Sequence, residues 1–230
     1  MRTRAGIILQ ARVGSSRLPG KALEAIHGCS MLERCLRRLI AGGVAHVVLA
    51  TTTLYEDDAL AAIAGRLGVP VFRGNVEDVL GRYAGAAEAF DLDPVVRATG
   101  DNPAVDIQAA GRVLAELRRT GADFVIEEGL PHGAGVEAMT RSALCHSELV
   151  ADSAYDREHV TSFIKGHRDV FRLIDLAAPT PLRRPDLHVT VDTFEDLDWV
   201  RELYFRADSS EPSLTELIAA AGRSQLRKAA

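Results

Sequence analysis

The stretch that decides the fold is residues 5–21, AGIILQARVGSSRLPGK. Its beginning, residues 5–10, is an apolar run that predicts a buried strand, and a loop rich in Gly, Ser and Arg follows directly. In an open α/β sheet, ligands bind beyond the carboxyl ends of the strands. We therefore expect a ligand site at the end of this first strand.

The chain after this loop alternates further strands with helices. The apolar patterns predict strands over residues 47–50, 69–72, 94–98 and 123–126, and helices over residues 31–41, 56–67, 76–90 and 107–120. Ser30, with Glu33 three residues later, is expected to form a capping box at the first helix. This alternation predicts a three-layer α/β fold with a mainly parallel sheet and helices on both faces.

The pattern changes near residue 127. A loop rich in Gly, Pro and His is followed by predicted strands at 136–139, 170–176 and 188–191 and predicted helices at 142–150, 156–166, 194–205 and 213–221. We interpret residues 1–230 as a single domain. Its core is expected at about 1–126 and 186–230, with an inserted section at about 127–185.

Composition limits the classes of function. The net charge of −5 and the aromatic content of 5% argue against nucleic acid as a partner, because polyanion binders are usually basic and stacking platforms need several aromatic rings. The three cysteines form no CxxC pair, which argues for a reducing compartment and against structural zinc. Arg12 ends the first apolar run too early for a signal peptide, and no stretch is long enough to span a membrane. We expect a cytoplasmic protein.

The loop after the first strand carries three cations, Arg12, Arg17 and Lys21, with no acid before Glu24. Small residues that allow a close backbone approach or add hydrogen-bond donors lie between these cations: Gly14, Ser15, Ser16 and Gly20. Together these residues suit a polyphosphate ligand. Taken alone, they fit a solvated basic loop about equally well.

The spacing within this loop differs from that of a P-loop. Gly14 and Gly20 enclose five residues where a P-loop has four, and Ala22 stands where a metal-binding Ser or Thr is needed. A P-loop kinase or NTPase is therefore disfavoured.

Two aspartates follow predicted strands. Asp101 comes just after the strand at 94–98, and Asp192 ends the strand at 188–191, so both could hold a Mg²⁺ ion at one edge of the sheet. The alternative is that each aspartate caps the helix that follows it. Asp106 is better placed to cap the helix from residue 107, whereas Asp192 and Thr193 are both good caps for the helix from residue 194.

Five segments carry a resemblance to a known family: residues 8–21, 72–80, 96–101, 157–161 and 190–197. With these segments the chain resembles the cytidylyltransferase family that includes acylneuraminate cytidylyltransferases, and most of all its spore-coat polysaccharide biosynthesis branch. The resemblance implies a nucleotide-diphosphosugar transferase-like fold of the GT-A/Rossmann-like type. It also implies transfer of a nucleotide from CTP to a small acceptor with Mg²⁺ or Mn²⁺ as cofactor and pyrophosphate as product.

The resemblance also assigns roles to residues. It implies that the nucleotide is bound by Gln10, Ala11, Arg12, Gly14, Ser15, Ser16, Arg17, Lys21, Thr99 and Asp101, and that the metal is bound by Asp101 and Asp192. Arg12, Lys21 and Asp101 are expected to be catalytic, because in-line attack on phosphorus depends on positioning and charge stabilisation. The section at about 127–185 is expected to bind the acceptor and to build a homodimer.

Three further residues are expected to contact the acceptor: Arg73, Arg97 and Glu137. Each has an alternative interpretation. Arg73 could form a structural ion pair with Glu77 or Asp78, Arg97 could need a buried partner inside its strand, and Glu137 could belong to a surface loop.

The leading functional hypothesis is a CTP-dependent enzyme that acts on an acidic sugar. Phosphonates and sugar phosphates are alternative acceptors, and a GT-A-type glycosyltransferase or a non-catalytic nucleotide-binding regulator is an alternative class. Glu158 and His159 lie on a predicted helix, where such a pair is more often structural or part of an interface than catalytic.

Overall fold

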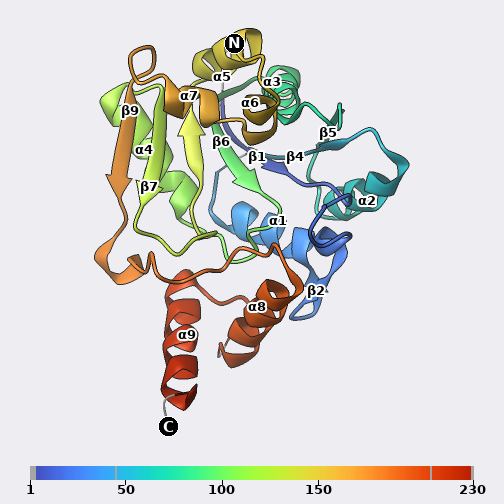
Figure 1. Cartoon of the computed structure of the whole chain (residues 1–230), viewed down its shortest axis with the longest axis vertical. Coiled ribbons are helices and arrows are strands. Elements are labelled where there is room, and N and C mark those ends of the chain that lie inside the picture. The colour runs from blue at the N-terminus through green and yellow to red at the C-terminus, as the bar shows by residue number, and fades with distance from the viewer. Residues whose placement is uncertain (1–3, 45, 208, 229–230) are drawn as a thin grey trace.

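The computed structural model describes residues 4–44, 46–207 and 209–228 (Figure 1). Seven strands form its main sheet, in the order β5-β4-β1-β6-β8-β7-β9. Their bounds are Arg4–Gln10 for β1, His46–Thr52 for β4, Val71–Gly74 for β5, Leu92–Thr99 for β6, Phe124–Glu128 for β7, Glu137–Met139 for β8 and Leu173–Ala177 for β9.

The sheet is mainly parallel. β5, β4, β1 and β6 run in one direction, β8 is antiparallel to both β6 and β7, and β9 is parallel to β7. The section at 127–185 supplies β8 and β9 to this same sheet. Gln10 at the end of β1 pairs with Thr99 at the end of β6, so the segments after these two strands begin side by side.

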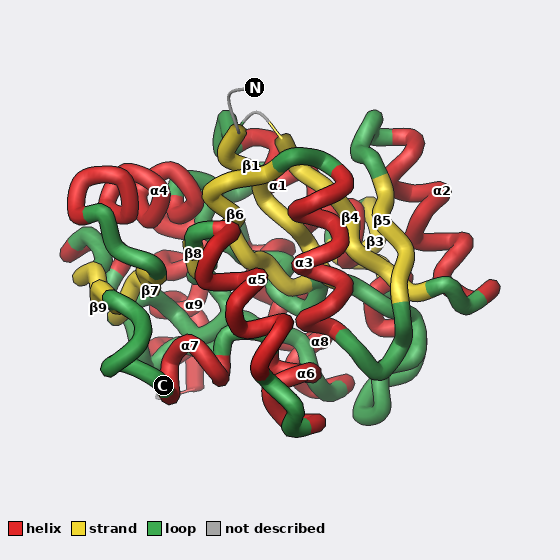
Figure 2. The backbone as a smooth tube through the Cα atoms, turned by 90° about the horizontal axis from the view of Figure 1, so that it is seen from above, coloured by secondary structure: helices red, strands yellow, loops and turns green. Residues whose placement is uncertain are grey.

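Helices cover both faces of the sheet, which confirms the predicted three-layer fold (Figure 2). Side chains alternate across a strand, and in β1 Ile7 and Leu9 face one core while Ile8 faces the other. The first core includes α1 (Met31–Ala41), α2 (Asp58–Arg66) and α4 (Ala109–Thr120), and the second includes α3 (Val79–Ala89) and α5 (Arg141–Val150). The apolar run that predicted β1 is continuous because both of its faces are buried.

The chain ends in α8 (Phe194–Arg206) and α9 (Leu214–Lys228), which lie below the sheet in Figure 1. Three short 3-10 helices, η1 (Lys21–Leu23), η2 (Tyr55–Asp57) and η3 (Thr180–Leu182), lie in loops. None of the helices within 4–44, 46–207 and 209–228 is long and apolar enough to cross a membrane.

Several local predictions differ from the structure. The predicted helix at 156–166 is two helices, α6 (Ala154–His159) and α7 (Ser162–Gly166), because the chain turns sharply at Val160. The predicted strand at 188–191 makes only one isolated bridge, between His132 and His188. A short hairpin of β2 (Ala25–Ile26) and β3 (Cys29–Ser30) was not predicted, since two-residue strands carry no periodic pattern.

The first helix begins as predicted but without a full capping box. The Ser30 hydroxyl accepts a hydrogen bond from the Glu33 amide at 3.2 Å. The Glu33 carboxylate instead pairs with Arg37 one turn later, at 2.7 Å.

Candidate active site

A cavity opens at the carboxyl ends of β1 and β6, where the sequence predicts a ligand site. Every residue predicted to bind the nucleotide lines it, apart from Gly14. Arg97, Asp192, Glu158 and His159 line it as well. The cavity thus brings together the loop after β1, the turn after β6, the end of α6 and the segment before α8.

The turn after β6 lies tightly against the end of β1. The Gly100 amide donates a hydrogen bond to the Gln10 carbonyl at 2.7 Å. A Cβ atom on Gly100 would lie 2.7 Å from the Cβ of Ala11, which is too close for any side chain. Glycine here allows Asp101 to follow β6 directly beside the loop.

The loop after β1 is held in place by a buried aspartate that the sequence analysis missed. Asp57 of η2 accepts a hydrogen bond from the Val13 amide at 2.7 Å, and also one from the Thr51 hydroxyl at 3.0 Å and one from the Thr52 amide at 3.1 Å. Its side chain is fully buried. Asp57 follows the carboxyl end of β4, so the rule that drew attention to Asp101 could have found it.

Lys21 joins the two predicted metal ligands. Its Nζ donates hydrogen bonds to the Val191 carbonyl at 2.7 Å and to Oδ1 of Asp192 at 3.0 Å, and it lies 3.6 Å from Oδ2 of Asp101. Arg17 approaches the same Asp192 oxygen, with its Nη2 at 2.8 Å. Asp101 and Asp192, 91 positions apart in the sequence (192 − 101), therefore face one ammonium group.

The helix-cap alternatives for these aspartates do not apply. Thr193 caps α8 through its own side chain, so Asp192 is free to face the cavity. The Asp106 carboxylate pairs with Arg112 at 2.6 Å and makes no side-chain cap for α4, contrary to the prediction. Asp101 is fixed by its backbone instead, since its carbonyl accepts the Val191 amide at 2.8 Å.

The chemistry of this pair fits a divalent cation. Mg²⁺ in proteins takes oxygen ligands, commonly one or two carboxylates together with water and phosphate oxygens. Within the described parts of the chain, no group of three or more His, Cys, Asp or Glu side chains could hold a metal ion. Asp101 and Asp192 thus suit a cation that takes its remaining ligands from a bound nucleotide and water.

Arg17 and Lys21 pair with aspartates of the cavity, but other polar groups of the loop have no partner among the described residues. In the part of the chain that the structure describes, neither the Arg12 guanidinium nor the hydroxyls of Ser15 and Ser16 make a hydrogen bond. Arg82 of α3 is 1% exposed, and among the described residues its Nε and Nη2 have no hydrogen-bond partner. Burial, and then the charge of Arg12, lowers the pKa of Arg82. This concentration of positive charge favours an anionic ligand.

A second cavity adjoins the first, and Arg97 and Thr99 line both. Arg97 pairs with Glu137 of β8, with Nη1 at 3.0 Å from Oε2. The Thr161 hydroxyl donates to the same oxygen at 3.0 Å, and Lys165 pairs with the other oxygen. Glu137 is therefore a buried strand residue, which corrects the surface-loop alternative.

These partners determine the charge of Glu137. Burial alone would raise its pKa, but the neighbouring charges of Arg97 and Lys165 and the hydrogen bonds from Lys165 and Thr161 outweigh it. The pKa of Glu137 consequently lies below its usual value, and the carboxylate stays ionised at neutral pH. Glu137 and Arg97 both line the second cavity, and Arg97 lines the first cavity as well, so Arg97 can face a ligand in either one.

Arg73 lies outside both cavities. It forms an ion pair with Asp58 of α2, with Nη2 at 2.6 Å from Oδ1. The sequence analysis offered Glu77 or Asp78 as the ion-pair partner of Arg73. That prediction is wrong, because β5 runs beside the start of α2 and so brings Arg73 to Asp58. The contact of Arg73 with the acceptor stays a prediction, and the location of Arg73 outside both cavities does not favour it.

Comparisons with known proteins show which family this chain is similar to. A family model described as Cytidylyltransferase matches residues 6–227. The spore coat polysaccharide biosynthesis protein SpsF of Bacillus subtilis is 33% identical over 218 residues, covering 92% of this chain and 91% of that protein.

Two solved structures extend the comparison. A cytidylyltransferase from Leptospira borgpetersenii serovar Hardjo-bovis superposes with a TM-score of 0.90 at 29% identity, over 98% of this chain and 96% of that one. CMP:2-keto-3-deoxy-manno-octonic acid synthetase complexed with CTP superposes with a TM-score of 0.66 at 20% identity, over 88% of this chain and 99% of that one. The second likeness concerns the fold alone.

The family match spans nearly the whole chain and agrees with the predicted class of enzyme. The chain is a nucleotidyltransferase that belongs to the cytidylyltransferase family.

Proposed function

We propose that this enzyme transfers CMP from CTP to a small acidic sugar, with Mg²⁺ as cofactor and pyrophosphate as the second product. The observation that carries the proposal is the convergence of the cationic loop and the two strand-end aspartates on Lys21 in one cavity. A glycosyltransferase would bind a diphosphosugar, which needs fewer cations than Arg12, Arg17 and Lys21 provide.

Each side of the first cavity has a task in this reaction. Arg12, Arg17 and Lys21 bind the triphosphate and stabilise the charge that develops on the leaving pyrophosphate. The backbone at Gln10 and Ala11 contacts the base. Asp101 and Asp192 hold Mg²⁺, which when bound neutralises charge on phosphate oxygens.

The second cavity is the proposed acceptor site, because it meets the first at Arg97 and Thr99. An acceptor there would present its hydroxyl toward the nucleotide and its acidic group toward Arg97. The name of one similar protein supports a sugar acceptor, since it belongs to spore coat polysaccharide biosynthesis.

The test is a pyrophosphate-release assay with each of the four nucleoside triphosphates, Mg²⁺ and a panel of acidic sugars, phosphonates and sugar phosphates. We expect release only with CTP and fastest with an acidic sugar. If pyrophosphate is released fastest with another acceptor class, that class is the substrate instead of an acidic sugar. Hydrolysis of a nucleotide sugar without release of pyrophosphate would favour a glycosyltransferase. No release with any combination would reject the proposal.

We further propose that the enzyme forms a homodimer through the surface around the end of α5 and the start of α6. Leu149 and Tyr155 are 79% and 64% exposed, and Val150 is 44% exposed, so three large apolar side chains are exposed close together in the sequence. Contiguous exposed apolar side chains mark interaction surfaces. Light scattering should show a dimer for the wild type and a monomer for Leu149→Glu, whereas Phe205→Glu on α8, equally exposed, should stay dimeric. A monomeric wild type would reject this interface.

A further inference from the structure

The turn between α6 and α7 has an unusual backbone. Val160 has φ 54° and ψ −56°, and the Thr161 amide donates to the His159 carbonyl at 2.5 Å. A positive φ is rare for a β-branched residue, and this i to i+2 hydrogen bond describes a strained γ-turn. Such strain persists where the surroundings enforce it, and it concentrates at functional sites.

The surroundings of this turn enforce it from both sides. On the α6 side, Arg157 donates from Nη2 to the Glu148 carbonyl at 2.8 Å and from Nε to the Ala151 carbonyl at 2.9 Å. On the α7 side, Thr161 donates to the buried Glu137. The Val160 side chain is itself fully buried. The positions of the two residues just before the turn, Glu158 and His159, are therefore fixed relative to the cavity.

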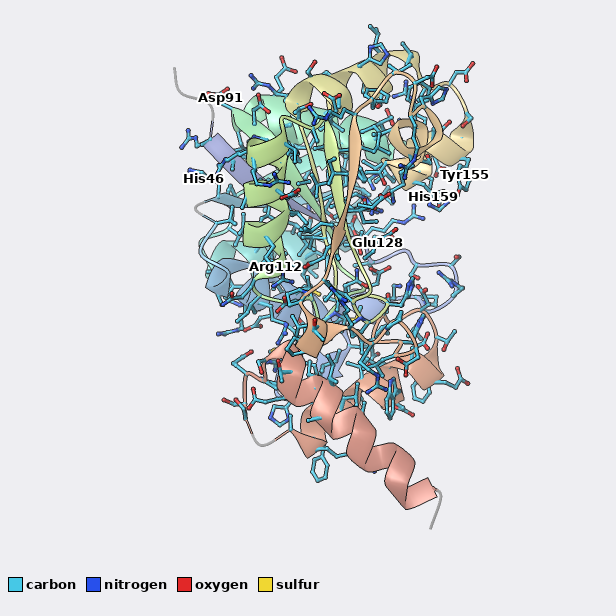
Figure 3. The ribbon with its side chains drawn as sticks, turned by 90° about the vertical axis from the view of Figure 1, so that its left-hand side faces the viewer. His46, Asp91, Arg112, Glu128, Tyr155 and His159 are labelled. Carbon is cyan, nitrogen blue, oxygen red and sulfur yellow. The ribbon has the colours of Figure 1, made fainter. Side chains whose placement is uncertain are left out.

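Glu158 and His159 both line the nucleotide cavity, and nothing in the proposed binding of the triphosphate uses them. The His159 ring lies against Tyr155, with centroids 4.2 Å apart and planes tilted by 51° (Figure 3). Among the described residues that line this cavity, His159 is the single imidazole. The two aspartates there are already paired with Lys21, which leaves Glu158 and His159 as the groups that could take up a proton.

The reaction needs such a group. An acceptor hydroxyl that attacks phosphorus must lose its proton, and histidine is the side chain that most often performs this task near neutral pH. We propose that His159 is the general base of the reaction, placed by the strained turn at Val160; this inference rests on the proposed function above. The acceptor O–H bond breaks as its oxygen bonds to the α-phosphorus. The bond from the α-phosphorus to the bridging oxygen breaks with its electron pair leaving on pyrophosphate, and the proton passes to His159.

The experiment compares His159→Ala and His159→Gln with the wild type, using full-length enzyme, CTP and the best acceptor from the panel. We expect kcat to fall by about a hundredfold or more in both variants. Calorimetry should give an unchanged Kd for CTP, since His159 is not among the proposed phosphate ligands. Added imidazole should restore part of the kcat of His159→Ala and leave the wild type unchanged. His146→Ala, which removes an exposed histidine on α5, is the matched control.

Three results would overturn the inference: a kcat for either variant within about threefold of the wild type, a loss confined to CTP binding, or no recovery with imidazole. The proposed function fails separately, since it fails only if the wild type itself releases no pyrophosphate with any nucleotide and acceptor. In that case the role of His159 fails with it.

Discussion

The two halves of the sheet reach the active site in different ways. On the β5-β4-β1-β6 side, all strands are parallel, and the ligand-facing residues follow directly after β1 and β6. On the β8-β7-β9 side, β8 runs against its neighbours, and Glu137 of β8 joins a network with Arg97 of β6, Thr161 of the turn after α6 and Lys165 of α7. The half that we propose binds the nucleotide depends on local motifs, whereas the half that we propose binds the acceptor depends on tertiary contacts.

The largest effect is expected in the cavity that we propose binds the nucleotide. Asp101→Ala should lower kcat by at least about a hundredfold, because it removes one of the two carboxylates proposed to hold the metal. The fold should persist, since the Asp101 side chain is 32% exposed. Steady-state kinetics with CTP and Mg²⁺ measures the loss, and Asp186→Ala, from a surface ion pair, should behave as wild type. An Asp101→Ala enzyme with normal turnover would disprove the metal assignment.

The acceptor side should lose stability when its network is broken. Glu137→Ala leaves Arg97 and Lys165 without their carboxylate partner, and breaking a buried pair in this way costs about 3–5 kcal/mol. Urea unfolding measures this cost. The control is Glu24→Ala, whose half-exposed ion pair with Arg201 should contribute less than about 1 kcal/mol. Equal costs for the two variants would contradict the assigned network.

The stability that the Glu137 network contributes depends on pH. The folded-state pKa of Glu137 lies below its usual 4.5, so its charge contributes stability that is present above about pH 4.5. That contribution is lost as the pH falls below 4.5 through the folded-state pKa. The difference in unfolding free energy between the wild type and Glu137→Gln should therefore shrink as the pH is lowered. A difference that grows toward low pH would be inconsistent with an ionised Glu137.

A smaller effect is expected at Asp57, whose hydrogen bond with the Val13 amide holds the loop after β1 in place. Asp57→Asn should weaken the hydrogen bonds to Val13 and Thr51, at a cost of about 1–3 kcal/mol, and raise the Kd for CTP by about tenfold. Thermal unfolding and calorimetry measure the two effects. The neighbouring Asp58→Asn, half-exposed on α2, should change neither. If Asp57→Asn binds CTP normally, the loop does not depend on this anchor.

The smallest effect concerns Arg73. Its ion pair with Asp58 is 31% and 52% exposed, and pairs of this kind contribute little, so Arg73→Met should leave kcat and KM within about twofold of the wild type. Steady-state kinetics with varied acceptor provides the measurement. A rise in the KM for the acceptor, with kcat unchanged, would show that Arg73 contacts the acceptor after all.

This contrast explains how much could be predicted from the sequence. The parallel core and the loop from Arg12 to Lys21 were predictable, because apolar runs and glycine-rich cation clusters are local signals. Asp57 also follows a strand, but its role was missed because its hydrogen bond with the Val13 amide joins residues 44 positions apart and forms only in the folded chain.

The acceptor half was less predictable for a physical reason. A strand over residues 136–139 was predicted, but the burial of Glu137 was not, because a three-residue strand such as β8 shows no alternation that would mark its buried face. The break at Val160 was invisible as well, since no glycine or proline marks it and the turn is enforced by distant contacts such as that of Thr161.

The loop after β1 is proposed to bind the two phosphates that leave as pyrophosphate. Calorimetric titration of the wild type and Lys21→Met with CTP and with CMP, in the presence of Mg²⁺, tests it most directly. We predict that the wild type binds CTP at least about a hundredfold more tightly than CMP, and that Lys21→Met loses most of this preference while its affinity for CMP is retained. Equal affinities of the wild type for CTP and CMP, or an unchanged preference for CTP in Lys21→Met, would show that the loop does not bind these two phosphates.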